Sequence, residues 1–331
     1  MSIEQALVIG AGVSGLTTAV RLQEAGLATR ILTRETPDDT VSRVAAAVWH
    51  PYRAYPEDRV NAWSLQSLDV FRRLAEDPET GVVFHPLYEL FQGQVPEPGW
   101  RRQVEGLRKP RPEELARFGD GRNPRFRDGW VLPVPVIETP IYVPWLLERF
   151  EAGGGTLEVD PKGAPPLDEL TRPDRLVVCC VGLGARDYLD DAEMVPIRGQ
   201  VVAVDNPGLE RIVVDEEGPG DPTYAIPRSE DVILGGTTWE GVEDLAPDPE
   251  VTAEILARNR RLQPSLERAA VRRVLVGLRP GRSAVRLEGE HRSMGPVIHN
   301  YGHGGAGYTL SWGCADEVVT LMRQMAKSTW A

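Results

Sequence analysis

Residues 8–16 read VIGAGVSGL and place Gly10, Gly12 and Gly15 in the spacing Gly-x-Gly-x-x-Gly. The apolar run 5–9 predicts a buried strand before the motif, and apolar residues at helical spacing over 16–24 predict a helix after it, ended by Gly26. In this context Gly10 permits a tight turn, Gly12 lets a pyrophosphate approach the backbone, and Gly15 lets the helix pack closely on the strand. The free N–H groups and dipole of the helix N-terminus favour an anionic ligand. The segment therefore predicts a dinucleotide-binding unit.

A second strand and an acidic residue complete this unit. The run 29–33 predicts the next strand, and Glu35 follows it at the position from which a carboxylate accepts hydrogen bonds from an adenosine ribose. Its neighbour Arg34 is interpreted as a surface residue or a contact on the adenine side. The unit does not distinguish NAD from FAD, so the rest of the chain has to decide.

The composition of the 331-residue chain is ordinary for a globular protein, with 41% hydrophobic and 26% charged residues. The net charge of -12, without a basic patch, argues against general nucleic-acid binding. The sequence has no apolar run long enough to span a membrane and no signal-peptide pattern at its start, so we expect a cytoplasmic protein. Three cysteines are too few for a disulfide scaffold or a zinc site, and no metal is expected. The adjacent Cys179 and Cys180 are expected to be buried packing groups on opposite faces of a strand.

Periodicity divides the remaining chain into helical, strand-rich and loop segments. Helices are predicted over 61–75, 144–152, 250–267 and 309–327. Strands are predicted over 175–181, 200–204 and 232–234, with strand and loop over 275–287. Proline- and arginine-rich loops are expected through 94–136.

These segments predict an α/β protein of two intertwined parts. The α/β features at 3–35, 175–185 and 299–327 are separated by β-rich insertions. We therefore expect a Rossmann-like nucleotide-binding domain built from the discontinuous segments 1–50, 140–195 and 285–331. The segments 51–139 and 196–284 are expected to form a β-rich (α+β) substrate-binding domain.

The segment 299–307, HNYGHGGAG, is unusually rich in glycine for a stretch that leads into a helix. Such a backbone allows something flat or bulky to approach closely. A helix that starts near Gly307 directs its N–H groups at that ligand. This arrangement suits the anionic pyrimidine end of a reduced flavin, whose negative charge develops as hydride arrives.

Several segments in order along nearly the whole chain resemble the D-amino-acid oxidase family, which also contains D-aspartate oxidases. The most specific are the glycine-rich tail and residues 44–52, VAAAVWHPY. The others are VIGAGVSGL at 8–16, RGQ at 198–200, YAIP at 224–227, LGGT at 234–237 and GLRP at 277–280.

The resemblance implies noncovalently bound FAD and oxygen as the second substrate. It implies that Arg279 pairs with the substrate carboxylate, that Tyr224 hydrogen-bonds the same group, and that the Gly305 carbonyl accepts from the substrate amine. A planar guanidinium suits this role because it grips a carboxylate through two parallel hydrogen bonds. Val48, His50 and Ile226 are expected to line the substrate pocket. A catalytic role for His50 is disfavoured, because a lone histidine is more often a hydrogen-bonding spacer.

The cofactor site is expected to combine the fingerprint, the alanine-rich segment and the tail. Its members are Gly10, Ala11, Gly12, Val13, Ser14, Gly15, Arg34, Glu35, Ala45, Ala46, Ala47, Gly182, Gly304, Gly305, Gly307, Tyr308 and Thr309.

In the reaction that the resemblance implies, hydride leaves the α-carbon for flavin N5, and the imino acid hydrolyses to a 2-oxo acid and ammonia. Oxygen then reoxidises the flavin and yields hydrogen peroxide. No side chain need act as a general base, which agrees with the lack of a Ser-His-Asp constellation. The expected partners are therefore a small D-amino acid and oxygen. A homodimer is compatible with the sequence but is not decided by it.

Two departures from the family pattern bear on the substrate. Vertebrate members carry a lid tyrosine four residues before the one that matches Tyr224, whereas this chain has Gly220 there, which predicts an open entrance. D-aspartate oxidases place an arginine after Gly-Gly-Thr, where this chain has Thr238, so a neutral substrate is favoured. Arg228 is an alternative cation, which keeps D-aspartate oxidase open, as is a glycine or secondary-amine oxidase. An NAD-linked dehydrogenase leaves the tail and Arg279 unexplained, and motifs alone do not refute a flavin-binding protein without turnover.

Overall fold

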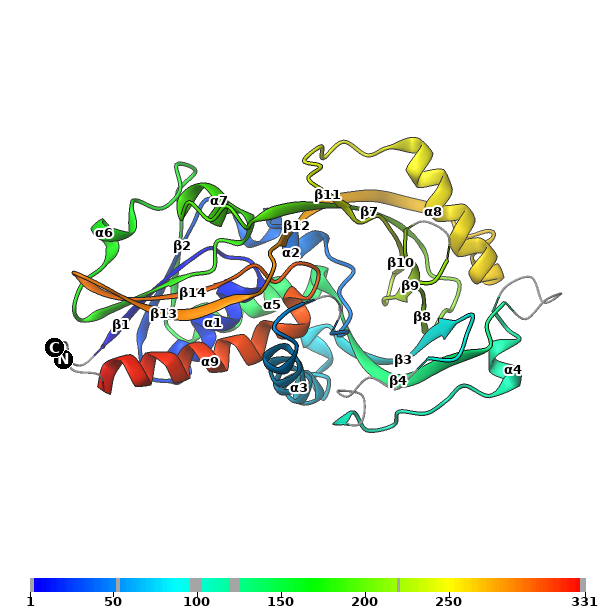
Figure 1. Cartoon of the computed structure of the whole chain (residues 1–331), viewed down its shortest axis with the longest axis horizontal. Helices are drawn as coiled ribbons and strands as arrows, with labels where there is room; N and C mark the ends of the chain where they lie inside the picture. Colours follow the sequence, from blue (N-terminus) through cyan, green and yellow to red (C-terminus); the bar gives the residue numbers. More distant parts are fainter. Residues whose placement is uncertain (1–2, 52–53, 96–102, 119–124, 219–220, 328–331) are drawn as a thin grey trace.

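The computed structural model describes residues 3–51, 54–95, 103–118, 125–218 and 221–327. Two β-sheets lie side by side along the long axis of the molecule, and each is covered by helices (Figure 1). Within the described residues, no helix has the length and apolar character needed to cross a bilayer.

The first sheet has six strands among the described residues, in the order β13-β14-β6-β1-β2-β5. All neighbouring pairs are parallel except β13 with β14. The bounds are β1 (Gln5–Ile9), β2 (Ala28–Thr33), β5 (Thr156–Val159), β6 (Arg175–Cys179), β13 (Arg286–Arg292) and β14 (Gly295–Tyr301). Strands far apart in sequence therefore meet in one mostly parallel sheet, which confirms the predicted α/β class and its discontinuous construction.

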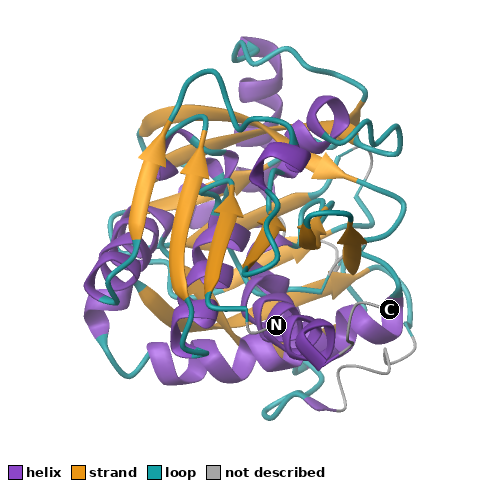
Figure 2. Ribbon diagram, turned by 90° about the vertical axis from the view of Figure 1, so that its left-hand side faces the viewer, coloured by secondary structure: helices purple, strands orange, loops and turns teal. Residues whose placement is uncertain are grey.

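Helices α1 (Val13–Glu24), α3 (Glu57–Leu74), α5 (Thr139–Ala152) and α9 (Gly307–Lys327) pack together beside this sheet. Helix α9 approaches α3 very closely, because a Cβ on Gly313 would lie 2.2 Å from the carbonyl oxygen of Trp63. The Trp312 indole donates to the Tyr142 hydroxyl of α5 over 2.8 Å. These contacts hold the long C-terminal helix along the molecule (Figure 2 shows helices flanking the strands).

The second sheet has eight strands among the described residues, and its main path runs β11-β7-β10-β9-β8-β3-β4, with β12 paired to β7. Its strands are β3 (Val82–Phe91), β4 (Asp128–Ile137), β7 (Val195–Asp205), β8 (Ile212–Asp215), β9 (Thr223–Pro227), β10 (Asp231–Gly235), β11 (Trp239–Glu240) and β12 (Val271–Gly281). Figure 1 shows the long strands β7 and β12 running side by side from the region of the first sheet into the second sheet. This pair therefore connects the two parts of the molecule.

Helix α8 (Pro249–Leu262) covers the outer face of the second sheet, where Val251 and Ile255 pack against Val202 and Leu234. The remaining short helices are α2 (Val41–Val44), α4 (Pro112–Leu115), α6 (Leu167–Leu170) and α7 (Ala185–Tyr188), with 3-10 turns at Pro37–Asp39, Pro78–Thr80, Gly182–Gly184 and Pro264–Leu266.

Two expectations about elements need correction, and strand β3 was not predicted. The stretch 94–136 is not loop throughout, since β4 occupies its end, where prolines at 133 and 135 alternate with buried apolar residues. The strand β3, which pairs with it, had no prediction. The helix predicted over 250–267 ends at Leu262, because Pro264 lacks a backbone N–H and restricts the residue before it.

Most of the segments that were expected to form one domain supply strands to the same sheet, with helix α3 as an exception. Segments 1–50, 140–195 and 285–331 supply the first sheet, and 196–284 supplies most of the second. Helix α3 lies within 51–139 but packs mainly against α9, with a smaller contact with β4 of the second sheet. Cys179 and Cys180 are buried in two different apolar clusters, as expected for neighbours in an extended segment.

Candidate active site at the junction of the two sheets

A cavity of about 1270 Å³ lies where the two sheets meet. Its walls come from both sheets and from the connecting segments, and they include Gly10, Glu35, Val48, Tyr224, Arg279 and Gly305. This volume exceeds the roughly 300–1,000 Å³ usual for sites of drug-sized ligands. The cavity therefore has room for a large ligand and a second small molecule.

One end of the cavity is the N-terminus of α1. No described residue accepts a hydrogen bond from the amides of Ala11, Gly12 or Ser14. A Cβ on Gly15 would lie 2.0 Å from the Gly10 carbonyl oxygen, and one on Gly10 would lie 2.5 Å from that of Cys180. These close approaches let α1 pack tightly against the ends of β1 and β6. The amides of Ala11, Gly12 and Ser14 belong to residues that line the cavity, as a phosphate site requires.

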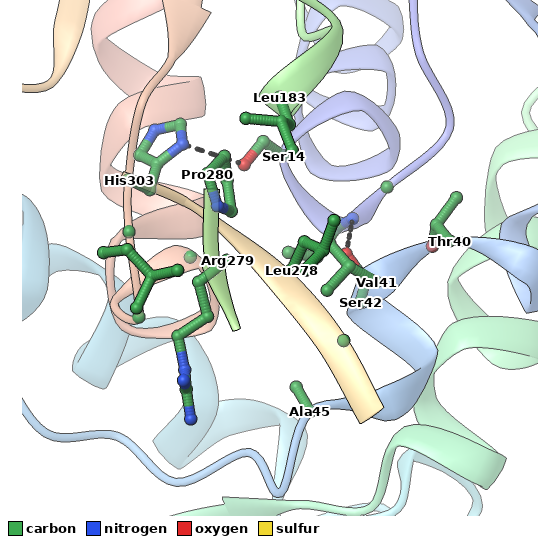
Figure 3. Close-up of a pocket in the computed structure, with 18 of the residues that line it drawn as sticks. Ser14, Thr40, Val41, Ser42, Ala45, Leu183, Leu278, Arg279, Pro280 and His303 are labelled. Carbon is green, nitrogen blue, oxygen red and sulfur yellow. Dashed lines mark hydrogen bonds between the residues drawn. The ribbon is translucent and has the colours of Figure 1, made fainter. Parts of the chain in front are cut away.

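Ser42 was missed by the sequence interpretation. Its hydroxyl oxygen accepts from the Val13 amide over 2.9 Å, so it satisfies one of the free donors at the start of α1 (Figure 3). Its carbonyl accepts from the Tyr308 hydroxyl over 2.7 Å. Because Ser42 lines the cavity, its own hydroxyl proton can serve a ligand oxygen. The only feature of the sequence that could have indicated Ser42 is its position two residues before the segment 44–52, which matches the family.

Residues at the ends of β2 and β6, the two parallel strands on either side of β1, extend this wall. Arg34 and Glu35 follow β2, and Gly182 follows β6; all three line the cavity. Glu35 has no ion-pair partner within the described part of the chain. Its carboxylate therefore suits the ribose contact expected from the sequence.

The glycine-rich tail forms the opposite wall. Gly304 donates its amide to the Pro280 carbonyl over 2.9 Å, which ties the tail to the end of β12. The carbonyl of Gly305 receives no hydrogen bond from any described residue, and the Gly307 amide at the start of α9 donates to none. The tail thus offers the Gly305 carbonyl as a hydrogen-bond acceptor and, two residues later, the Gly307 amide as a donor.

The segment 45–50 runs beside β4. Ala47 accepts from the Ile137 amide over 2.9 Å, and the Trp49 amide donates to Pro135 over 3.0 Å. The Trp49 ring is fully buried against α3, with its indole N–H on the Ser64 carbonyl. This anchoring leaves Val48 and His50, on either side of Trp49, at the cavity.

The Arg279 guanidinium extends into the cavity from β12, away from Ser14 and His303 (Figure 3). Its Nη1 donates to the Thr237 carbonyl over 3.0 Å, and none of the described carboxylates pairs with it. A Cβ on Gly199 would lie 2.3 Å from Nη1, so the glycine at 199 makes the space that the guanidinium occupies. A cation held in place without a counter-ion is a ready site for a carboxylate.

The Tyr224 ring packs over the last residue of β10, since a Cβ on Gly235 would lie 1.8 Å from its ring. Its hydroxyl has no hydrogen-bond partner among the described residues. Ile226, two residues along β9, faces the same side and also lines the cavity.

His50 faces a buried carboxylate that the sequence did not single out. Its Nε2 lies 3.7 Å from Oε1 of Glu89 on β3, and both side chains are largely buried. Thr309 exchanges hydrogen bonds of 3.1 Å with the amide and carbonyl of His50. Thr309 therefore holds the His50 backbone.

His303 is buried between the tail and α1. Its Nε2 lies 3.1 Å from Asn300 Oδ1, and its Nδ1 lies 3.5 Å from the Ser14 hydroxyl. Since an amide oxygen only accepts, Nε2 carries the proton. Burial lowers the pKa of His303 to about 4, so the ring is neutral at physiological pH.

The structure brings nearly all the predicted site residues to one cavity. The lining contains Gly10, Ala11, Gly12, Val13, Ser14, Arg34, Glu35, Ala45, Ala46, Ala47, Val48, His50, Gly182, Tyr224, Ile226, Arg279, Gly304, Gly305, Gly307 and Tyr308. Gly15 and Thr309 lie outside the lining, where Gly15 serves helix packing and Thr309 holds His50. Tyr52 and Gly220 lie outside the described residues.

The chain matches the family model described as FAD dependent oxidoreductase over residues 5–321. The chain belongs to this family. FAD is its cofactor, and the free amides at the start of α1, the carboxylate of Glu35 and the open glycine-rich wall fit a dinucleotide with a flavin at its other end.

Named relatives lie close in sequence. A D-amino-acid oxidase from Rubrobacter xylanophilus is 47% identical over 321 residues, covering 96% of both chains. One from Streptomyces coelicolor is 41% identical, and a human D-aspartate oxidase is 36% identical over 98% of this chain and 96% of its own. Among solved structures, glycine oxidase from Geobacillus kaustophilus has a TM-score of 0.79 at 19% identity, covering 98% of this chain and 95% of its own. At that identity the similarity shows the fold alone.

Proposed function

We propose that this chain is a D-amino-acid oxidase that deaminates neutral D-amino acids to 2-oxo acids, ammonia and hydrogen peroxide. The observation that carries the proposal is the meeting of Arg279, the Tyr224 hydroxyl and the Gly305 carbonyl in one cavity, none with a carboxylate or hydroxyl partner among the described residues. An amino acid offers the complementary groups, a carboxylate and an amine. The similarity to proteins named D-amino-acid oxidase supports the D-configuration.

Arg279 and Tyr224 bind the substrate carboxylate in this proposal. The bond from Nη1 to Thr237 fixes the plane of the guanidinium and leaves its other N–H groups for the ligand. The phenol adds a neutral donor to the same carboxylate. The Gly305 carbonyl accepts from the amine on the other side, so two fixed anchors orient the α-carbon.

With both anchors engaged, only one enantiomer directs its α-hydrogen toward the flavin side of the cavity. When bound, FAD accepts that hydride and passes the electrons to oxygen. The chain contributes orientation, which converts binding energy into rate. No side chain near the anchors has to remove a proton in this scheme.

The choice of a neutral over an acidic substrate rests on two positions, 238 and 228, that could have supplied a second cation. Thr238 occupies the position where D-aspartate oxidases place an arginine, and its amide and hydroxyl both bond Asp221. Arg228 is buried in a bidentate ion pair with Asp231, at 2.7 and 2.8 Å, and does not line the cavity. Neither residue offers a charge to a second substrate carboxylate.

Anaerobic reduction of the bound flavin tests the proposal. Purified holoprotein is mixed with D-alanine, D-valine, D-phenylalanine, D-aspartate, glycine and the L-forms, and loss of flavin absorbance is followed. We expect rapid bleaching by the neutral D-amino acids and none by the L-forms.

The other outcomes identify the rival functions. Preferential bleaching by D-aspartate or glycine would assign the chain to those oxidases, and bleaching by L-forms would overturn the proposed orientation. A flavin that no amino acid bleaches would indicate a binding protein without turnover. We also propose a cytoplasmic location and a homodimer, which cell fractionation and size-exclusion chromatography test.

A further inference from the structure

The turn at residues 235–237 touches both side chains that the proposed function assigns to the substrate carboxylate. The Thr237 carbonyl accepts from Arg279 Nη1 over 3.0 Å. The Tyr224 ring rests on Gly235, and a Cβ on Gly236 would lie 2.9 Å from the Tyr224 hydroxyl. The position of this one turn therefore sets the separation between the guanidinium and the phenol.

The turn is held from behind by α8. Asn259 Nδ2 donates to the Gly235 carbonyl over 3.1 Å, and Arg258 Nη2 donates to the Gly236 carbonyl over 3.1 Å. The Gln200 amide adds a bond of 2.9 Å to the Thr237 hydroxyl. Figure 1 shows α8 on the outer side of the second sheet, and none of its residues lines the cavity. Its grip on the turn thus acts at a distance from any ligand.

Asn259 is fully buried, and Ile255, one turn earlier on the same face of α8, belongs to an apolar cluster that also contains Leu266. A buried amide is costly unless it is hydrogen-bonded, and a leucine of similar volume would suit an apolar cluster better. Only its N–H groups are used, toward Gly235 and Ile255, while Oδ1 has no partner among the described groups. The hydrogen bond from the Asn259 side chain to the Gly235 carbonyl therefore explains why an amide occupies this buried position.

We propose that Asn259 and Arg258 are positioning residues for substrate binding. By holding the carbonyls of the turn, they fix Arg279 and Tyr224 at the spacing that a carboxylate needs. The inference rests on the proposed function, because that function assigns these two side chains to the substrate, and it extends the site to a helix whose residues do not line the cavity.

The test compares Asn259→Leu with the wild-type holoprotein. Two quantities are measured: the Kd of 3-methyl-2-oxobutanoate, a 2-oxo acid, from its perturbation of the flavin spectrum, and KM and kcat for D-valine. We expect both Kd and KM to rise about threefold to tenfold, the effect of one lost hydrogen bond, with FAD retained and a smaller change in kcat.

Controls separate positioning from general packing. Ile255→Ala removes a buried apolar side chain one turn earlier on the same face of α8 and should leave the Kd within twofold of wild type. If Asn259→Leu does not fold, the partly exposed Arg258 provides the second test: Arg258→Met should raise Kd and KM, and Arg258→Lys, which keeps a donor, should restore them in part.

Unchanged Kd and KM in Asn259→Leu and Arg258→Met would overturn the inference, as would an equal rise in Ile255→Ala. If the wild-type flavin is not reduced by D-amino acids, the proposed function fails. The Kd of the 2-oxo acid then still decides the inference, because it requires no turnover.

Discussion

Arg279 acquires its proposed role from residues that were not obvious in the sequence. Its guanidinium occupies space left by Gly199 on the paired strand, and its orientation is fixed by the Thr237 carbonyl. The sequence supplied the residue type and a matching motif, but the free guanidinium is a consequence of strand pairing between β7 and β12.

Replacement of this arginine has a defined expected effect. Arg279→Met should lower kcat/KM for neutral D-amino acids by about 100-fold to 1,000-fold, because two charge-assisted hydrogen bonds are lost, while the protein stays yellow. Steady-state kinetics and the flavin spectrum measure both. Arg272→Met on the same strand, which removes an exposed ion pair with Asp205, serves as the control. Loss of FAD from the Arg279 variant would contradict the assignment.

His303 provides a pH-dependent prediction. Its pKa of about 4 in the folded chain lies below the ordinary value of about 6.5, so protonation favours the unfolded state. The free energy of unfolding should therefore fall as pH drops from about 6.5 to about 4, by roughly 3 kcal/mol at about 1.4 kcal/mol per pKa unit. Urea unfolding of the apoprotein between pH 7 and 4 measures this. His303→Gln should show a shallower decline, and equal slopes in the two proteins would refute the buried neutral ring.

At the scale of elements, the N-terminus of α1 depends on a partner outside the fingerprint. The helix, both flanking strands and the position of Gly26 follow from periodicity and turn chemistry, and all were predicted. Strands β3 and β4 were not, because their prolines and charged residues mask the alternation. Ser42, which satisfies the Val13 amide, lies on α2 and reaches α1 only in the folded chain.

Ser42→Ala should therefore weaken FAD binding and lower the free energy of unfolding by about 1–3 kcal/mol, because a buried donor loses its acceptor. FAD titration of the apoprotein and urea unfolding measure the two effects. Ser67→Ala is a matched control, since that hydroxyl accepts from the Gly313 amide over 2.9 Å between α3 and α9, away from the cavity. An equal loss of FAD affinity in both variants would argue against a specific role for Ser42.

At the scale of the whole molecule, the cavity lies between two sheets that share one large buried apolar cluster, which includes Val8 of β1 and Val134 of β4. Arg34 and Glu35 come from the first sheet, Tyr224 and Arg279 from the second, and the bond from Gly304 to Pro280 links the two walls. A ligand that spans this junction contacts both parts at once, so its binding energy is shared between them.

Removal of FAD should accordingly destabilise the entire chain. At FAD concentrations near 100 times Kd, the holoprotein should be more stable than the apoprotein by about 2.7 kcal/mol, and a single thermal transition should shift as a unit. Differential scanning calorimetry with and without FAD tests this. A second transition that FAD does not move would show that one sheet unfolds independently.

The sequence by itself determined the α/β class, the dinucleotide fingerprint, the glycine-rich tail and the residue types of the site, because strand and helix periodicity, turn glycines and motif spacing are local properties. Only the tertiary structure decided which groups are left without partners. It showed Arg228 neutralised by Asp231, Arg279 without a counter-ion among the residues that the structure describes, and the turn at 235–237 held by Asn259. Arg279 and Thr237 are 42 residues apart in the sequence, and Asn259 and Gly235 are 24 apart, so these contacts depend on strand register and helix packing, which no short segment encodes.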